Sequence, residues 1–559
     1  MARGGEAHAG FPREGHAMPD SATAFAEARA HQQAGRLFEA AALGREVLAA
    51  TPRHPGAQHL LGVIAYRLGN AAAAIDWLEK AAATDDGAAQ CHDDLGLAYA
   101  AARRFGEAAA SHRRALRLQP DFVEARFHLG NALVGLGDKK AAAVCYRAAL
   151  AVRPDYADAQ ANLGLMLFED GRIEEAMACY RAALALDPAS PILHNNLGNA
   201  HVRQGDFAAA TEAFEQAIRL DPRYVAPRIN AGNAMLERGD PQTAIACYES
   251  ALRLAPEQVE AHRNLGLVRL LLGDFPGGWP EWRWPAPGPA RFAQPEWRGE
   301  TLDGVPILLH AEQGFGDILQ FVRYVPLVAA RGGRVILEVP AELRRVLGKM
   351  AGADIVLTCG EALPDFVWHC PLLSLPLAFG TTLDTIPKAL PYIAAPAPAA
   401  LPSAGAAALR VGLVWAGRPE HNRDRIRSVP LAALAPLAGL SGAAFYSLQK
   451  GAAAQQAATA PFPLVDLAPH LDDFVDTAAA IAALDLVVTV DTAVAHLAGA
   501  LGKPVWLLLS CVPDWRWLLG RDDSPWYPTA RLFRQPAAGK WAAVAEQVAA
   551  ALAEAAGSR

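Results

Sequence analysis

Small and apolar residues recur through the first half of the chain with a period of 34 positions, and the register never slips. Each repeat carries a leucine or alanine followed by glycine: Leu61-Gly62, Leu95-Gly96, Leu129-Gly130, Leu163-Gly164, Leu197-Gly198, Ala231-Gly232 and Leu265-Gly266. If this glycine is position 8, alanine recurs at positions 20 and 27, an aromatic residue at 24 and proline at 32. Small residues let two helices pack closely, and proline ends a helix. The pattern predicts stacked helical hairpins, from a degenerate repeat at 21–54 to a truncated one after 258.

The pattern changes beyond residue 304, where short apolar runs alternate with glycine-rich turns and helical stretches. One series begins at 305–310, and a second begins at 409 with LRVGLVWAG. Alternating strands and helices are typical of parallel, doubly wound sheets. A proline- and alanine-rich linker at 391–408 separates the two series. We therefore expect two α/β lobes with a cleft between them, and a last helix over 540–555 between the lobes.

Four tryptophans crowd the proline-rich junction between the two halves: Trp279, Trp282, Trp284 and Trp297. We expect a capping helix around 279–282 and then an extended connector. The rings either stack on a carbohydrate or seal the repeats against the next domain, and sealing is favoured. The predicted organisation is a disordered tail (1–20), a repeat superhelix (21–285), a connector (286–304), an N-terminal lobe (305–400) and a C-terminal lobe (409–559).

Charge and composition narrow the function classes. The formal net charge of −7 argues against nucleic-acid binding, which requires a basic surface. Seven cysteines are present without a CxxC pair, so we expect no structural zinc site and no metal. The first 20 residues lack the apolar core of a signal peptide, and no uncharged apolar run reaches the roughly 18 residues of a membrane span. We therefore expect a cytoplasmic protein.

Asparagine recurs at repeat positions 6 and 9, which share one face of the first helix because they are three residues apart. The row consists of Asn131, Asn162, Asn196, Asn199, Asn230, Asn233 and Asn264. An amide offers donors and an acceptor, and so suits the backbone of an extended peptide of any sequence. The alternative is that the amides cap or bridge neighbouring helices. Peptide binding is favoured, because asparagine is a poor residue for a helix interior.

The 34-residue period resembles that of the tetratricopeptide repeat, a helix-turn-helix unit that stacks into a superhelix with a concave binding face. The asparagine row resembles the one that lines the superhelix of O-linked N-acetylglucosamine transferases, which hold polypeptide substrates. The resemblance implies that the concave face binds a polypeptide acceptor or a partner protein.

Candidate chemistry lies at predicted strand ends, where parallel sheets bind their ligands. The first such segment is a glycine-rich turn whose aspartate is either a base or a helix cap: Gly314, Gly316 and Asp317. The second is a tight strand exit followed by arginines, which forms either a diphosphate clamp or a solvated loop: Gly417, Arg418, Arg423, Arg425 and Arg427. Lys450 follows another strand and could reach a phosphate or a base.

The strongest segment is DLVVTVDTAVAHLAGALGKPVW at 485–506, in which a buried strand ends at Asp491 and a helix begins at once. The free amides of Thr492, Ala493 and Val494 would face an anion, and His496 lies one turn further on. An aromatic-rich loop follows, which either lines the pocket or packs the last helix: Trp515, Arg516, Trp517, Trp526 and Tyr527.

This segment resembles the signature of glycosyltransferase family 9, the heptosyltransferases, in which D-[ST]-G-x-x-H-x-x-[AG]-A-x-x-x-P binds a nucleotide-diphosphate sugar. The turn at 314–317 is similar to that family's acceptor-lobe loop, which implies that Asp317 is the catalytic base. The resemblance likewise implies that Asp491, Thr492 and His496 bind the donor. Two departures are Ala493, where the family has glycine, and Arg425-Ile-Arg427-Ser-Val-Pro430, where it has Lys-Arg-Trp-Pro.

The fold class that follows is an α-solenoid of tetratricopeptide repeats joined to a two-lobed GT-B glycosyltransferase with two Rossmann-like parallel sheets. We expect an inverting, metal-independent enzyme that uses a nucleotide-diphosphate sugar as co-substrate, needs no cofactor and modifies a polypeptide held by the repeats. One alternative is a scaffold whose sugar-nucleotide domain has decayed. Another is that the repeats dock a partner while the transferase modifies a glycan or lipid.

Overall fold

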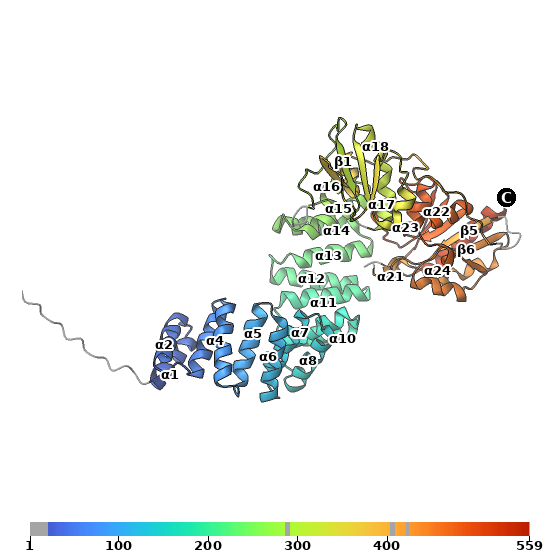
Figure 1. Cartoon of the computed structure of the whole chain (residues 1–559). Coiled ribbons are helices and arrows are strands. Elements are labelled where there is room, and N and C mark those ends of the chain that lie inside the picture. The colour runs from blue at the N-terminus through green and yellow to red at the C-terminus, as the bar shows by residue number, and fades with distance from the viewer. Residues whose placement is uncertain (1–20, 285–290, 313, 403–408, 421–423, 558–559) are drawn as a thin grey trace, which may run out of the picture. The chain divides into compact units, whose positions relative to one another are not determined.

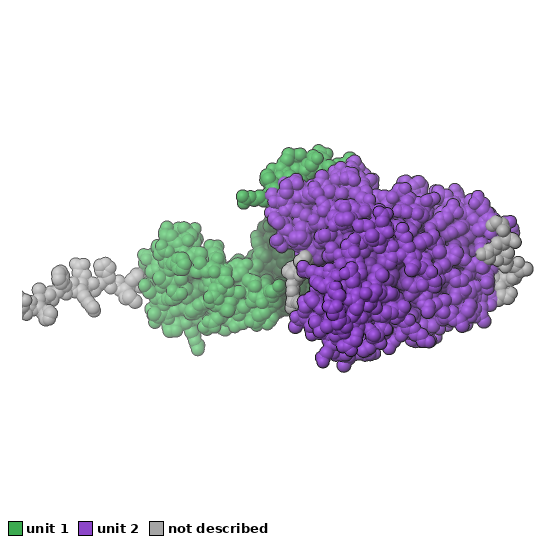
Figure 2. Space-filling model, turned by 90° about the horizontal axis from the view of Figure 1, so that it is seen from above, with its two compact units in different colours: residues 1–224 green, residues 225–559 purple. Residues whose placement is uncertain are grey.

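The computed structural model describes residues 21–284, 291–312, 314–402, 409–420 and 424–557, so the tail expected at 1–20 lies outside the described residues. The chain divides into two compact units, Met1–Tyr224 and Val225–Arg559 (Figure 2). The first unit holds six helical hairpins, and the second holds further repeats and both sheets (Figure 1). Because this division falls inside the repeats, the boundaries at 285, 305 and 409 stay predictions.

The repeats are pairs of antiparallel helices, as the period predicts. The helices of the first unit are α1 (Ser21–Gln33), α2 (Leu37–Ala50), α3 (Pro55–Arg67), α4 (Ala71–Thr84), α5 (Ala89–Ala101), α6 (Phe105–Leu118), α7 (Val123–Gly135), α8 (Lys139–Val152), α9 (Ala157–Glu169), α10 (Ile173–Leu186), α11 (Pro191–Gln204) and α12 (Phe207–Leu220). The second unit continues with α13 (Ala226–Arg238), α14 (Pro241–Leu254), α15 (Val259–Leu271) and α16 (Phe275–Trp282). The predicted capping helix is α16.

The repeated glycine at position 8 has a steric cause. In the repeat that begins at residue 123, Gly130 on α7 faces the ring of Tyr146 on α8. A Cβ at Gly130 would lie 2.5 Å from Cε1 of Tyr146, which is closer than van der Waals contact allows. Gly232 and Tyr248 repeat this contact in the second unit. The glycine therefore lets the second helix bury its aromatic residue against the first.

The rest of the second unit is built on two parallel sheets, as expected. The smaller has the order β3-β2-β1-β4, with β1 (Pro306–His310), β2 (Arg334–Val339), β3 (Ile355–Thr358) and β4 (Trp368–Pro371). Its helices are α17 (Phe315–Phe321), α18 (Val325–Ala330), α19 (Ala341–Leu347) and α20 (Leu375–Ala378).

The larger sheet has the order β10-β9-β8-β5-β6-β7, with β5 (Leu409–Val414), β6 (Ala443–Ser447), β7 (Leu464–Asp466), β8 (Leu486–Val490), β9 (Val505–Leu509) and β10 (Ala530–Arg534). Its helices are α21 (Asp424–Arg427), α22 (Phe474–Ala483), α23 (Ala493–Ala500) and α24 (Trp541–Gly557). We expected the last helix between the lobes. Instead, Val544 and Leu552 of α24 share an apolar cluster with Val411 and Phe445 of the larger sheet.

The tryptophans of the junction pack against neighbouring side chains. Trp279 and Trp297 are fully buried in the apolar cluster that includes the smaller sheet. Trp279 lies edge-on to Trp515, with ring centroids 5.2 Å apart, and its Nε1 donates to the carbonyl of Thr381 at 2.9 Å. Trp284 stacks on His262 at 3.5 Å. The rings therefore seal α15 and α16 against the sheets of the same unit.

Candidate active site

A cavity of about 810 Å³ lies at the carboxyl ends of the strands in the second unit. Its walls come from the turn after β1 of the smaller sheet and from segments after β5, β6, β8 and β9 of the larger one. The predicted site residues that line it are Gly314, Gly316, Asp317, Gly417, Arg418, Arg427, Lys450, Asp491, Thr492, Ala493, Val494 and His496. Arg425 is exposed on α21 and does not line the cavity, and Arg423 lies outside the described residues.

Asp317 lies in the first turn of α17 and accepts a hydrogen bond from Nη2 of Arg516. Arg516 also donates to Asp514 at 2.8 Å through Nη1 and to Gln320 at 2.5 Å through Nε. Burial raises the pKa of Asp317 above its ordinary value, and the positive charge of Arg516 opposes that shift. One arginine from the larger lobe therefore holds this carboxyl group in position and opposes the increase in its pKa.

The N-terminus of α23 also faces the cavity, with Thr492 in the N-cap position. Backbone N–H groups at a helix N-terminus carry a positive partial charge and attract anions. Burial raises the pKa of the neighbouring Asp491 to about 6, and the negative charge of Asp514 adds to the shift. The cavity thus combines an anion-attracting helix end with a carboxyl group that exchanges its proton close to neutrality.

His496 is held as a neutral imidazole beneath this helix end. Its Nδ1 lies 2.9 Å from the hydroxyl of Tyr527, and its ring stacks on Trp517 at 5.5 Å. Burial lowers the pKa of His496 to about 3. A Cβ at Gly316 would lie 2.8 Å from Cδ2 of His496, so this glycine lets α17 and α23 approach. The helix that carries Asp317 and the helix after Asp491 are therefore in direct contact.

Two arginines of the predicted clamp reach the cavity. Arg427 donates from Nη1 to the carbonyl of Asp491 at 3.1 Å and from Nε to Asp424 at 3.2 Å. Arg418 lies over the ring of Phe315, 5.8 Å from its centroid. Lys450 lines the cavity as well, and its Nζ donates to the carbonyl of Ala468 at 3.0 Å.

The asparagine row has two kinds of members. Asn131 accepts hydrogen bonds from the hydroxyl of Tyr146 at 2.8 Å and from the amide of Asn162 in the next repeat at 3.0 Å. Asn233 makes the same pair of contacts with Tyr248 at 2.7 Å and Asn264 at 3.0 Å. These four amides bridge helices, which is the alternative that the sequence left open.

The other amides of the row are placed differently. Asn199 occupies the same repeat position as Asn131, but its own repeat carries Phe214, which has no hydroxyl, in place of a tyrosine. Among the described residues no hydrogen bond is found for Asn199 or Asn196, and Asn230 has a partner. Asn196 and Asn199 are therefore the members of the row whose amides do not bridge helices among the described residues.

Family models match both halves of the chain. Models of the tetratricopeptide repeat match residues 25–89, 94–143, 130–171, 164–205, 191–224 and 232–273. The model of glycosyltransferase family 9 (heptosyltransferase) matches residues 442–508. The chain thus carries tetratricopeptide-repeat matches in its first half and a glycosyltransferase family 9 match in its second. The family 9 match includes Lys450, Asp491 and His496, whereas Asp317 and Arg427 lie outside it.

The chain is also similar to a curated bacterial protein, Protein FlbA of Caulobacter vibrioides, with 28% identity over 297 residues. This similarity covers 47% of the chain, and the chain spans about half (49%) of the length of that relative. No helix of the described residues is long and apolar enough to cross a membrane.

Similar solved structures include the Cut9–Hcn1 hetero-tetramer of the APC/C (TM-score 0.37, 17% identity, 42% of this chain and 45% of that one). Another is YrrB, described as a TPR protein with an unusual peptide-binding site (TM-score 0.30, 20% identity, 33% of this chain and 95% of that one). A third is MamA from Desulfovibrio magneticus RS-1 (TM-score 0.29, 22% identity, 30% of this chain and 96% of that one).

Several residues that line or support the cavity were not expected at the site. Gln449 accepts hydrogen bonds from the backbone of Trp415 at 3.0 Å and Ala416 at 2.9 Å, and so fixes the exit of β5. Asp514 and Arg516 line the cavity. From the sequence, the loop that carries Arg516 was expected either to line the pocket or to pack against the last helix. The loop does both, since its aromatic residues are buried: Trp515, Trp517, Trp526 and Tyr527. Its alternation of charged and aromatic residues was the signal available.

Proposed function

We propose that the protein transfers a sugar from a nucleotide-diphosphate sugar to a hydroxyl group of a polypeptide held by its repeats. The observation that carries the proposal is the convergence of two segments on one cavity: the turn with Asp317 after β1, and the helix N-terminus after Asp491. The first offers a base and the second an anion site. An acceptor hydroxyl and a donor diphosphate need these two groups on opposite sides of the reacting carbon.

The diphosphate of the donor binds at the N-terminus of α23 in this proposal. The backbone N–H groups of Thr492, Ala493 and Val494 face it, and Arg427 and Arg418 add positive charge from the strand exit of β5. Support comes from the hydrogen bond of Arg427 to the carbonyl of Asp491, which holds the guanidinium beside this helix end. Guanidinium groups and amide dipoles stabilise the charge of the leaving diphosphate.

Asp317 acts as the general base. Its carboxylate removes the proton of the acceptor hydroxyl as that oxygen attacks the anomeric carbon, and the bond from this carbon to the diphosphate oxygen breaks with its electron pair leaving on the diphosphate. Attack on the face opposite the leaving group inverts the configuration. Burial supports this role, because it raises the pKa of Asp317 toward the range in which a carboxylate is a useful base.

The contact between Arg516 and Asp317 favours a second candidate, in which the domain binds sugar nucleotides without transferring the sugar. An arginine on the carboxylate opposes the increase in its basicity, and Ala493 departs from the family's glycine. In a third candidate the repeats dock a partner and the transferred sugar goes to a glycan or lipid.

A titration separates these candidates. Uridine-, guanosine- and adenosine-linked sugar nucleotides are titrated by calorimetry into the whole chain and into Asp491→Ala. Saturable binding by the wild type that the variant loses supports the donor site and identifies the nucleoside of the donor. Transfer assays with the bound donor then compare wild type with Asp317→Asn. Binding without transfer supports the second candidate. Transfer at the wild-type rate by Asp317→Asn would show that Asp317 is not the general base.

A further inference from the structure

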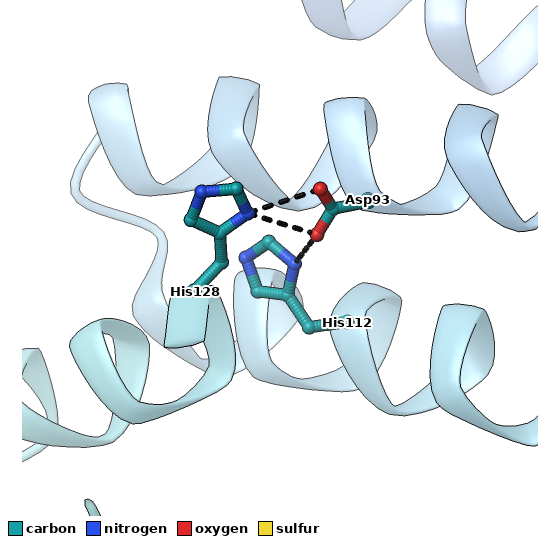
Figure 3. Close-up of side chains that lie close together, drawn as sticks. All are labelled: Asp93, His112 and His128. Atoms are coloured by element: carbon teal, nitrogen blue, oxygen red, sulfur yellow. Dashed lines mark hydrogen bonds and ion pairs between the residues drawn. The ribbon is translucent and has the colours of Figure 1, made fainter. Parts of the chain in front are cut away.

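Three side chains that can bind a metal meet between adjacent repeats of the first unit (Figure 3). They come from three successive helices: Asp93 from α5, His112 from α6 and His128 from α7. Nδ1 of His112 lies 2.7 Å from the Asp93 carboxylate, and Nδ1 of His128 lies 3.0 Å and 3.1 Å from its two oxygens. One potential ligand atom from each residue lies within 4.8 Å of the others.

The cluster is buried but can be reached from outside. The side chains of Asp93 and His112 are 2% and 1% exposed, whereas that of His128 is 20% exposed. Burial raises the pKa of Asp93, but hydrogen bonds from the two histidines outweigh it and hold the pKa below its ordinary value. Asp93 is therefore ionised. Nε2 of His112 is buried without a hydrogen-bond partner.

The same three-way junction exists elsewhere in the array with neutral side chains. At two other junctions a tyrosine at position 24 and an asparagine at position 6 of the next repeat both donate to one asparagine: Tyr146 and Asn162 to Asn131, and Tyr248 and Asn264 to Asn233. In the repeat that begins at residue 89, position 24 is His112, position 6 of the next repeat is His128, and the acceptor is Asp93.

Joining two repeats therefore does not require a charged group. A phenol and two amides bridge the helices without burying a charge, and burial of a charge is costly. At the junction of the repeats that begin at residues 89 and 123, histidines take the tyrosine and asparagine positions, and the acceptor is a carboxylate at position 5 instead of an asparagine at position 9. Two imidazoles and a carboxylate are the donor set that zinc and similar ions take in proteins.

We propose that Asp93, His112 and His128 bind a divalent transition-metal ion of the zinc class, which clamps α5, α6 and α7 together. Bonds of about 2.0–2.2 Å to nitrogen and oxygen place tetrahedral ligand atoms roughly 3.3 Å apart. The distances from the two histidine Nδ1 atoms to the Asp93 carboxylate need to increase by a few tenths of an ångström. The two Nδ1 atoms also need to move toward each other so that both reach the ion. When the ion takes the Nδ1 position, the Nδ1 proton of a neutral imidazole moves to Nε2, and a doubly protonated imidazole releases one proton to solvent. Water completes the fourth position. The inference does not depend on sugar transfer.

The test is metal binding by the whole chain, with His128→Asn as the matched variant. Asparagine is the residue at this position in the repeats that carry Asn162, Asn196, Asn230 and Asn264. It keeps a donor to Asp93 and removes one ligand. The control is His194→Asn, which changes a half-buried histidine outside the cluster whose Nε2 is hydrogen-bonded to the carbonyl of Pro188. Chelator-treated, reduced protein is titrated with ZnCl2 by calorimetry, and with Co²⁺ while its visible absorption is followed.

The expected result is one site in the wild type and in His194→Asn, with the intense visible bands of tetrahedral Co²⁺. In His128→Asn the affinity falls by roughly 100-fold or more, since even outer-shell changes weaken metal sites by about 10–100-fold. Zinc should also raise the unfolding temperature of the wild type but not of His128→Asn. The absence of binding in the wild type overturns the proposal. Equal affinity in His128→Asn overturns it as well, because the ion is then held by other residues.

Discussion

The guanidinium of Arg516 donates a hydrogen bond to the carboxylate of Asp317, and the two residues enter the cavity from different sheets. Arg516 follows β9 of the larger sheet, and Asp317 follows β1 of the smaller one. The same guanidinium binds Asp514 and Gln320, so a single side chain couples both walls of the site. The position of Asp317 is thus tied to a residue of the opposite lobe, whose positive charge opposes the increase in its pKa.

Removal of Arg516 should move the pH dependence of sugar transfer. Burial already raises the pKa of Asp317, and Arg516 opposes this shift. Because a nearby cation lowers the pKa of a carboxyl by about 1–3 units, Arg516→Met should shift the acidic limb of kcat/KM upward by about 1 unit or more. Measured pH–rate profiles of wild type and variant check this. A uniform loss of rate with an unmoved limb would indicate that Arg516 only maintains structure.

Gly316→Ala should separate the two helices that carry the site. The added Cβ would lie 2.8 Å from Cδ2 of His496, whose ring is fixed by Tyr527 and Trp517. Overpacking of this kind costs about 1–3 kcal/mol, and the shift of α17 should also lower kcat. The matched control is Gly314→Ala, because a Cβ there lies 3.7 Å from Asp317, an ordinary contact. Thermal unfolding and transfer rates of both variants test the difference, and equal behaviour would contradict it.

Local and periodic features of this chain could be predicted from sequence, because each is written within one segment. The 34-residue register predicted the helical hairpins and their close packing, whereas the contact between Gly130 and Tyr146 became visible only in the structure. Asp491 and the helix after it could be placed at a strand end, because a buried run and a helix start are adjacent in sequence. Strand ends of parallel sheets then meet at one edge.

Contacts between distant segments could not be predicted in the same way. Arg516 and Asp317 are 199 residues apart, and sequence alone does not say whether a charged residue among tryptophans points into a cavity. The orientation of α24 depends on which sheet offers it an apolar surface, and the larger sheet does. His112 could have been singled out from sequence, because it stands at position 24, where the later repeats carry tyrosine or phenylalanine. Its contacts with Asp93, and those of Asp93 with His128, become visible only when the repeats stack.

Donor binding should take up protons at Asp491. The pKa of this carboxyl is about 6, so it is mostly ionised at neutral pH and gains a proton as the pH falls through 6. A diphosphate at the adjacent helix end adds negative charge and raises this pKa further, and the protonated carboxyl would donate to the diphosphate a hydrogen bond that Asp491→Ala removes. Donor affinity should therefore increase as the pH falls from about 7 to about 6. Calorimetry in two buffers of different ionisation enthalpy measures the uptake, which Asp491→Asn should abolish. Buffer-independent enthalpies in the wild type would contradict the assigned donor position.

The asparagine row should divide into structural and ligand-binding members. In Asn131→Ala the hydroxyl of the buried Tyr146 loses its acceptor, which should cost about 1 kcal/mol of unfolding free energy. In Asn199→Ala no tyrosine is affected, because the same position of its repeat carries Phe214. This variant should unfold like the wild type. If amides read a peptide backbone, a labelled unstructured peptide of arbitrary sequence is a sufficient probe, and Asn199→Ala should bind it several-fold more weakly by fluorescence anisotropy. Unchanged peptide binding in Asn199→Ala would assign the whole row to bridging between helices.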